Sequence, residues 1–205
     1  MMNMISFFVF LLIWSAAHSF FASHTWKDWL EKRVGQVFMQ RYYRFWYNFF
    51  SLVTILPAAL IYISTESKIL YSVEMPWKAA MLAGQAVGLL LMGVAVLQTG
   101  FWRFVGLEPQ ADLRSGEMVP FVTSGLYSLM RHPIYSGTYL LLICDPTMTE
   151  VKLMTYLIFA IYVFIGIYFE ERRLTREFGD LYHDYKARVP MLIPGLKRKQ
   201  YDPTH

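Results

Sequence analysis

Apolar runs long enough to cross a bilayer recur along this chain and constrain its fold more than any other feature. Five can be drawn, and they cover 2–22, 45–64, 77–99, 134–147 and 153–169. Because a helix rises 1.5 Å per residue, about twenty apolar residues cross a hydrocarbon core of roughly 30 Å. Hydrophobic residues make up 56% of the chain and charged residues only 17%, which is typical of an integral membrane protein. The sequence therefore predicts an all-α membrane bundle of five transmembrane helices.

No internal repeat or low-complexity linker divides the chain, so we expect residues 1–205 to form a single domain. The first apolar run lacks the basic n-region of a cleaved signal peptide and is too long for one. We therefore expect it to be retained as the first span. The single cysteine, Cys144, excludes an internal disulfide and a cysteine metal cluster, and we expect no metal site.

Basic residues are distributed unevenly between the segments that flank the apolar runs. Sixteen of the nineteen lysines and arginines fall in 23–44, 100–133 and the C-terminal tail, whereas Lys68, Lys78 and Lys152 fall on the other side. Lysine and arginine are enriched in cytoplasmic loops. We therefore predict an external N-terminus and a cytoplasmic C-terminal segment. Because the basic residues form no patch interleaved with aromatics, no nucleic acid is expected as a partner.

Ionisable residues directly precede the fourth apolar run. The stretch 125–137 reads GLYSLMRHPIYSG, in which Arg131 and His132 come just before Pro133. Proline suits a first helical turn because the amide hydrogen that it lacks would be unpaired there. Ionisable groups at membrane depth are costly, which makes Arg131 and His132 candidates for function, with interfacial anchoring as the alternative.

The fourth run is short for a membrane span. Its 14 residues give a helix of roughly 21 Å, so either the bilayer thins or the helix starts below the cytoplasmic surface. A recessed start would place Arg131 and His132 in a protein-lined pocket. The Asp-Pro pair at 145–146 is expected to end this helix, and the chain then returns as the fifth span. The resulting helical hairpin would bring Glu170 and Glu171 beside His132, although a solvated helix end with intrahelical ion pairs is also possible for the two glutamates.

Small and polar residues within the apolar runs predict contacts between helices. Gly84 and Gly88, one turn apart, would allow two helix backbones to approach closely, either inside one chain or between subunits. The oligomeric state is therefore left open. Gln85 and Gln98 are expected to donate hydrogen bonds across helices or to face a cavity. For His18 in the first run, a helix–helix hydrogen bond is favoured over proton transfer.

Two blocks of this sequence resemble the isoprenylcysteine carboxyl methyltransferase family and its phospholipid methyltransferase relatives. The first contains TSGLY at 123–127 and RHPIY at 131–135, followed by Gly137. The second has matching acidic, aromatic and glycine positions, which are Glu170, Glu171, Leu174, Phe178, Gly179, Tyr182, Tyr185, Val189 and Pro190. The resemblance covers about 85–195, which we expect to be the catalytic core.

The resemblance implies methyl transfer from S-adenosyl-L-methionine to a small lipophilic or membrane-embedded acceptor at the cytoplasmic face of the membrane. It implies cofactor contacts at Val119, Pro120, Phe121, Val122, Tyr127, His132, Pro133, Ile134, Tyr135 and Glu170. The residue chemistry agrees, because Glu170 could neutralise the cofactor ammonium and an aromatic face could meet the purine or the sulfonium. The amides that begin the fourth span could bind its carboxylate. His132, Arg131 and Glu171 are the candidate catalytic residues.

The sequence leaves the methyl acceptor open. The eukaryotic prenylcysteine enzymes have an arginine for the substrate carboxylate where this chain has Gly166. A carboxylate acceptor needs no base, whereas a thiol or an amine must lose a proton, for which His132, His18 or Glu171 could serve. The candidate acceptors are a small thiol or acid, a phospholipid amine and a prenyl-type thioether.

Two alternative functions also remain open. Related membrane reductases share the Arg-His-Pro block and use NADPH, but they usually have asparagine before the tyrosine, where this chain has Ile134. A non-catalytic membrane assembly factor with the same fold would bind no cofactor.

Overall fold

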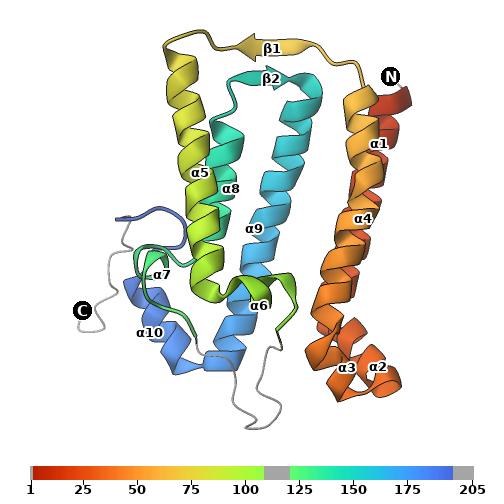
Figure 1. Cartoon of the computed structure of the whole chain (residues 1–205), viewed down its shortest axis with the longest axis vertical. Helices are drawn as coiled ribbons and strands as arrows, with labels where there is room; N and C mark the ends of the chain where they lie inside the picture. Colours follow the sequence, from red (N-terminus) through yellow and green to blue (C-terminus); the bar gives the residue numbers. More distant parts are fainter. Residues whose placement is uncertain (1, 109–120, 196–205) are drawn as a thin grey trace, which may run out of the picture. The chain divides into compact units, whose positions relative to one another are not determined.

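The computed structural model describes residues 2–108 and 121–195, which are almost entirely helical (Figure 1). The elements in chain order are α1 (Met2–Ala22), α2 (His24–Val34), α3 (Gln36–Arg41), α4 (Tyr43–Ser64), β1 (Ile69–Ser72), α5 (Trp77–Thr99), α6 (Phe101–Val105), α7 (Leu126–Leu129), α8 (Pro133–Ile143), β2 (Thr147–Thr149), α9 (Glu150–Phe178) and α10 (Asp180–Arg188). They divide into two units, the first built from α1 to α4 with α6, and the second from β1, α5 and residues 121–195.

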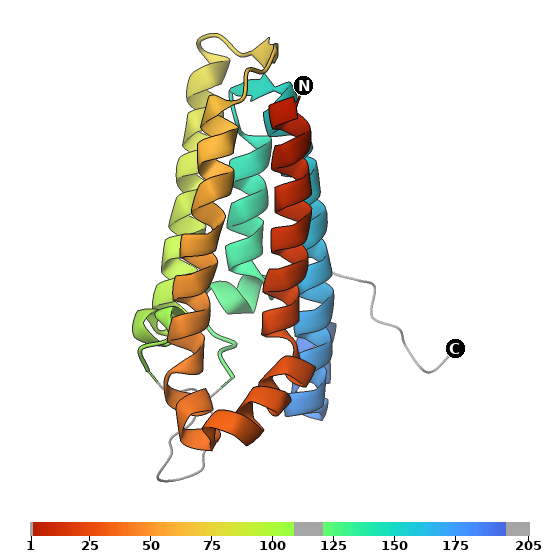
Figure 2. The same ribbon diagram turned by 90° about the vertical axis from the view of Figure 1, so that its right-hand side faces the viewer.

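In the first unit, α1 and α4 lie side by side and are joined through the short helices α2 and α3 (Figure 2). His18 on α1 bridges the pair, because its Nδ1 lies 3.0 Å from the Ser51 hydroxyl and its Nε2 lies 2.7 Å from the Tyr47 hydroxyl on α4. The imidazole also stacks on Trp14, with 4.7 Å between the ring centroids. The predicted helix–helix hydrogen bond of His18 is thereby confirmed.

In the second unit, α8 packs between α5 and α9. Gly88 on α5 and Gly137 on α8 face each other so closely that a Cβ on Gly88 would lie 2.8 Å from the Gly137 carbonyl oxygen. Gln85 donates a hydrogen bond from α5 to the Leu141 carbonyl, and Tyr139 on α8 donates one to the Ala160 carbonyl of α9. The close approach predicted for the small residues of α5 thus occurs within one chain.

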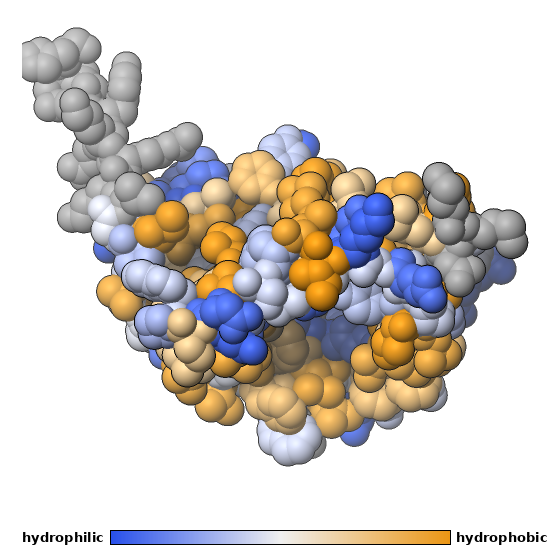
Figure 3. All heavy atoms as spheres, turned by 90° about the horizontal axis from the view of Figure 1, so that it is seen from above, coloured by the Kyte–Doolittle hydropathy of each residue, from blue (hydrophilic) through white to orange (hydrophobic). Residues whose placement is uncertain are grey.

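Among the residues that the structure describes, four helices are long and apolar enough to cross a membrane, namely α1, α4, α5 and α9. Large apolar side chains such as Leu90, Leu97 and Ile165 are exposed on them, and apolar surface (orange) is prominent in Figure 3. The fourth predicted span is shorter than expected, because α8 ends at Ile143 and its 11 residues rise only about 16 Å. The chain is therefore a multi-pass helical bundle in which four helices, rather than five, have the length of a span.

A two-stranded antiparallel ribbon, which the sequence did not predict, occupies one end of the second unit. β1 pairs with β2, with Ile69 opposite Thr149 and Ser72 opposite Thr147. Beneath it, the buried Asp145 carboxylate accepts hydrogen bonds from Lys152 Nζ at 2.9 Å and from the Tyr156 hydroxyl at 2.6 Å. Burial alone would raise the pKa of Asp145, but these hydrogen bonds hold it below its ordinary value.

Helix α9 continues well past the apolar run from which it was predicted. It begins at Glu150, where the Thr149 hydroxyl accepts a hydrogen bond from the Lys152 amide, and ends at Phe178. Gly179 has φ +52°, a conformation that favours glycine, and it separates α9 from α10. Gly179 therefore ends the long helix ahead of the segment that contains Tyr182 and Tyr185.

Candidate active site

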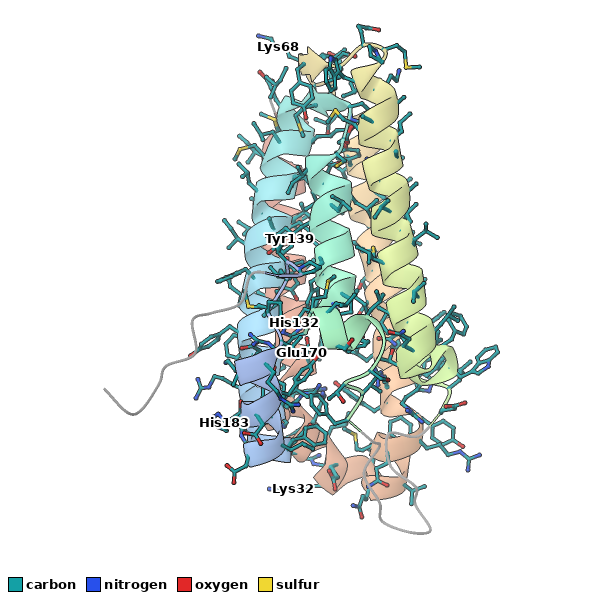
Figure 4. The ribbon with its side chains drawn as sticks, turned by 90° about the vertical axis from the view of Figure 1, so that its left-hand side faces the viewer. Lys32, Lys68, His132, Tyr139, Glu170 and His183 are labelled. Carbon is teal, nitrogen blue, oxygen red and sulfur yellow. The ribbon has the colours of Figure 1, made fainter. Side chains whose placement is uncertain are left out.

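The candidate active site lies at the end of the second unit opposite the ribbon, where α8 begins and α9 passes into α10 (Figure 1). His132 is the residue before the first turn of α8, and the buried Pro133 occupies that turn as predicted. Because α8 is short, its first residues lie beside the last turns of α9. Figure 4 shows His132 and Glu170 next to each other on these two helices.

His132 lies between two carboxylates of α9. Its Nε2 is 3.3 Å from Glu171 Oε1 and its Nδ1 is 3.7 Å from Glu170 Oε2. The imidazole itself is buried, with only 4% of its side chain exposed. The predicted arrangement, with the imidazole at the start of the fourth apolar segment and a carboxylate from the fifth in one place, is present in the structure.

Glu171 is surrounded by positive charge. Its Oε1 lies 2.6 Å from Arg131 Nη2, and its Oε2 lies 2.6 Å from Lys186 Nζ on α10. Only 11% of the Glu171 side chain is exposed. A buried charge is tolerated when it is paired and hydrogen-bonded, so these contacts make Glu171 a fixed anion.

Glu170 has a different environment although it is the next residue. Its side chain is 34% exposed, and the Tyr135 hydroxyl of α8 lies beside it. Within the described part of the chain, no lysine or arginine nitrogen lies within 4 Å of its carboxylate. Glu170 is therefore the carboxylate that is open to a cationic ligand.

The segment 186–192 covers the start of α8. The Arg131 amide donates to the Pro190 carbonyl at 2.9 Å and the His132 amide donates to the Met191 carbonyl at 3.1 Å. The Ser136 hydroxyl donates to the Leu192 carbonyl at 2.7 Å. The amides of Arg131 and His132, just before those that the sequence offered for a cofactor carboxylate, are therefore already bonded to the chain itself.

Aromatic side chains hold α10 against the segment before α8. Phe121 stacks on Phe178 with 4.9 Å between ring centroids, and its ring meets Tyr182 and Tyr185 edge to face. Tyr185 also donates a hydrogen bond to the Tyr127 carbonyl at 2.6 Å. Burial raises the pKa of Tyr182 and of Tyr185, so both hydroxyls stay neutral and able to donate.

The structure brings together some of the residues that the sequence singled out and separates others. It gathers Arg131, His132, Tyr135, Glu170 and Glu171 within one cluster, whereas Phe121 and Tyr127 belong to the aromatic contacts with α10. Pro133 and Ile134 form the first turn of α8, Val122 is half-buried beside Phe121, and Val119 and Pro120 lie outside the described residues.

Sequence reasoning missed the contribution of α10. Lys186 reaches Glu171, and Tyr182 and Tyr185 are buried beneath the site. A signal was present, because residues at 182, 185 and 186 are spaced three and four apart and so share one face of a helix. That spacing indicates which face of α10 is used, but not what this face packs against.

The site has the donors and acceptors to hold S-adenosylmethionine. The exposed carboxylate of Glu170 can pair with an ammonium or lie near a sulfonium, and the ring of Tyr135, whose centroid is 5.6 Å from that of His132, offers an aromatic face. Within 2–108 and 121–195, no three histidine, cysteine, aspartate or glutamate side chains are grouped to hold a metal.

Comparison with known proteins identifies the family that this chain matches. Residues 6–193 match the family described as NnrU protein. "Methanethiol S-methyltransferase 1" of Bradyrhizobium diazoefficiens is 47% identical over 74 residues, 36% of this chain and 26% of the relative. "Methanethiol S-methyltransferase" of Pseudomonas sp. (strain GM41(2012)) is 27% identical over 200 residues, 94% of this chain and 73% of the relative. The protein of the same name from Pseudomonas deceptionensis is 34% identical over 126 residues, 52% of this chain and 48% of the relative.

The chain thus spans about a quarter of the Bradyrhizobium relative, about half of the Pseudomonas deceptionensis one and nearly three quarters of the third. These relatives are membrane methyltransferases of the isoprenylcysteine carboxyl methyltransferase-like family, so the predicted resemblance is confirmed. No solved structure matches the chain.

Proposed function

The chain belongs to the NnrU protein family, and from this premise we propose that it is a membrane methyltransferase that transfers a methyl group from S-adenosylmethionine to a small thiol. The acceptor comes from the relatives, several of which are named for methanethiol. We further propose that the reaction takes place at the cytoplasmic face of a bacterial inner membrane, because most basic residues fall in the sequence segments 23–44, 100–133 and the C-terminal tail, which the succession of apolar runs assigns to one side.

The observation that carries this proposal is the contrast between Glu170 and Glu171. Glu171 is neutralised by Arg131 and Lys186, whereas Glu170, directly beside His132, has no such cation within the described residues. An uncompensated carboxylate at the edge of a buried cluster favours a positively charged ligand. S-adenosylmethionine carries two such groups, an ammonium and a sulfonium.

The residues of the site have distinct roles under this proposal. Glu170 binds the positive side of the cofactor, Tyr135 supplies an aromatic face, and His132 meets the acceptor. The cofactor supplies an activated methyl group, which the acceptor sulfur takes by in-line displacement. The chain contributes mainly by aligning the two reactants and excluding water, which can account for several kcal/mol of the barrier.

A transfer assay tests the proposal. The purified protein in detergent is incubated with S-adenosylmethionine labelled in its methyl group and with methanethiol, and volatile label is collected as dimethyl sulfide. We expect label in the thioether with wild-type protein and with Glu177→Gln, which changes an exposed carboxylate about two turns further along α9, and a large loss with Glu170→Gln. Label in a phospholipid or in an alkali-labile ester instead of the thioether would contradict the thiol acceptor.

The same preparation distinguishes the two alternatives. A reductase would bind and oxidise NADPH, and an assembly factor would bind neither S-adenosylmethionine nor NADPH. Calorimetric titration with S-adenosylhomocysteine and with NADPH therefore separates the three functions without knowledge of the acceptor.

A further inference from the structure

The two ring nitrogens of His132 differ in their distance from a carboxylate. The 3.3 Å between Nε2 and Glu171 Oε1 is within hydrogen-bonding range, whereas the 3.7 Å between Nδ1 and Glu170 Oε2 is beyond it. An ionised carboxylate only accepts hydrogen bonds. A neutral imidazole in this position therefore has its proton on Nε2, and its Nδ1 carries the lone pair.

We propose that Glu171, held in place by Arg131 and Lys186, fixes this tautomer of His132 and so makes Nδ1 the proton acceptor for the methyl-accepting thiol. His132 is the catalytic residue in this scheme, because it touches the reacting group. Glu171 and Lys186 are positioning residues that act through it. The inference rests on the proposed function, since only an acceptor that carries a proton needs a base.

The fixed position of Glu171 supports this assignment. Each of its oxygens has a cation at 2.6 Å, from Arg131 and from Lys186. Arg131 is itself anchored by hydrogen bonds from Nη1 to the carbonyls of Lys186 and Val189, both at 3.0 Å. A carboxylate held in this way keeps one orientation toward Nε2, as the third group of a nucleophile–base–orienter arrangement does.

The opposite side of the imidazole is the accessible one. Glu170 is 34% exposed and Glu171 only 11%, so a ligand approaches His132 from the side of Glu170, which Nδ1 faces. The charged and titratable groups around the imidazole include Arg131, Tyr135, Glu170, Glu171, Tyr182 and Lys186. Among these types of side chain, imidazole is the one whose ordinary pKa lies near neutral pH.

The proton transfer completes the methylation of a thiol. The S–H bond breaks and its proton goes to Nδ1, while the electron pair left on sulfur forms the new S–C bond to the methyl group. The bond between the methyl carbon and the sulfonium sulfur of the donor breaks, and its electron pair stays on that sulfur. The sulfonium thereby becomes the uncharged thioether of S-adenosylhomocysteine. The products are a thioether and an imidazolium, which returns its proton to water. A thiolate is a far better nucleophile than a thiol.

Nitrogen NMR tests the tautomer independently of any activity. Protein with ¹⁵N-labelled imidazoles in detergent is compared with His132→Gln, which identifies the His132 signals among those of the five histidines. For neutral His132 we expect a protonated Nε2 and an unprotonated Nδ1 in wild-type protein, and loss of that preference in Glu171→Gln. A protonated Nδ1 in wild-type protein would overturn the inference whatever the enzyme's substrate is.

A comparison of two thiols tests the role of the proton. Methanethiol is mostly protonated near neutral pH, whereas thiophenol is largely ionised and needs no base. In Glu171→Gln we expect the rate with methanethiol to fall on the order of 100-fold, a typical general-base contribution, and the rate with thiophenol to fall much less. Lys186→Met should also lose more rate with methanethiol than with thiophenol, but by a smaller factor. Lys186→Arg should keep the wild-type ratio of the two rates.

Each outcome of the thiol comparison has a clear meaning. Equal losses for the two thiols, with binding of S-adenosylhomocysteine retained by calorimetry, would show that Glu171 and Lys186 only stabilise the fold and would overturn the inference while leaving the proposed function intact. Failure of the wild-type protein to methylate either thiol would overturn both. Glu177→Gln is the matched control, and its ratio of rates should equal that of wild type.

Discussion

Arg131, just before α8, binds both the Glu171 carboxylate and the C-terminal end of α10. Its Nη2 pairs with Glu171, while its Nη1 donates to the carbonyls of Lys186 and Val189 at the C-terminal end of α10. The planar guanidinium offers several donors in fixed directions, which a lysine ammonium does not. Arg131 therefore holds α10 over the site as well as neutralising Glu171.

Arg131→Lys should consequently lower stability although it keeps the charge. The ammonium can still pair with Glu171, but it cannot also donate both hydrogen bonds to Lys186 and Val189. We expect a loss of about 1–3 kcal/mol in the free energy of unfolding, measured in detergent by denaturant titration. Arg172→Lys, at an exposed position on α9, is the control and should change little. Equal stability of the two variants would contradict the anchoring role of Arg131.

At this scale the sequence predicted the pairing of His132 with the glutamates but not the identity of their partners. The short fourth run and the hairpin that follows it place 132 beside 170 and 171 by helix geometry alone. Lys186 could not be placed in the same way, because its position depends on how α10 turns at Gly179 and packs on the aromatic rings. Such packing is a tertiary property that local sequence patterns do not determine.

At the scale of elements, the contact between α5 and α8 depends on glycine. A Cβ on Gly137 would lie 2.5 Å from the Gly88 carbonyl oxygen and 2.7 Å from Met92 Cγ. Since the first obstacle is backbone, it cannot be relieved by a side-chain rotation. Close packing of this kind contributes to helix association in lipid, where burial of apolar surface gives little driving force.

Gly137→Ala and Gly166→Ala form a matched pair of substitutions. The first should destabilise the protein by about 1–3 kcal/mol because α5 and α8 must separate. The second lies in α9 where a Cβ would meet nothing within 4 Å, so it should be neutral or stabilising by up to about 1 kcal/mol through helix propensity. Thermal unfolding of both variants in one detergent provides the measurement. A larger loss for Gly166→Ala than for Gly137→Ala would contradict the packing described here.

The hydrogen bonds of Asp145, beneath the ribbon, make the stability of the protein depend on pH. The folded-state pKa of its carboxyl lies below the ordinary value, so the carboxylate contributes stability at pH values above the unfolded pKa of about 4. That contribution is lost as the pH falls through the lower, folded pKa. Wild-type protein should therefore lose stability in acid relative to Asp145→Asn, which lacks the titrating group. Parallel stability curves for the two proteins between pH 7 and pH 3 would contradict this.

The elements were predicted with uneven success for physical reasons. Long apolar helices could be drawn because hydrophobicity over about twenty residues is a strong signal. The ribbon could not, because strands of four and three residues are too short to show an alternating pattern and are stabilised by pairing with each other. Helix α8 ends at Ile143, just before the Asp-Pro pair at 145–146 that was expected to end it, and 147–149 is used as a strand.

At the scale of the whole chain, the distribution of basic residues predicts which end of the second unit faces the cytoplasm. Ser72 lies in the ribbon and His183 in α10, at opposite ends of this unit, and both are exposed (Figure 4 labels His183). In a Cys144→Ala background, Ser72→Cys should react with a membrane-impermeant maleimide added outside intact cells, and His183→Cys should react only after permeabilisation. The reverse pattern would contradict the predicted topology.

The family and the class of chemistry could be predicted from the sequence because the matching residues flank the one apolar segment too short to be a simple span. The acceptor could not, since the position that carries an arginine in the prenylcysteine enzymes is Gly166 here, with open space beside it. The lack of this arginine argues against a prenylcysteine carboxylate as the acceptor, but it does not show which acceptor is used instead. That choice depends on the relatives and on experiment.

Binding of S-adenosylhomocysteine, measured by calorimetry in detergent, tests most directly whether Glu170 forms part of the cofactor site. The wild-type protein and Glu177→Gln should bind with equal affinity, while Glu170→Gln should bind about 10- to 100-fold more weakly, the loss expected for a hydrogen bond to a charged group. Equal affinity of all three proteins, or no binding by the wild type, would contradict the account.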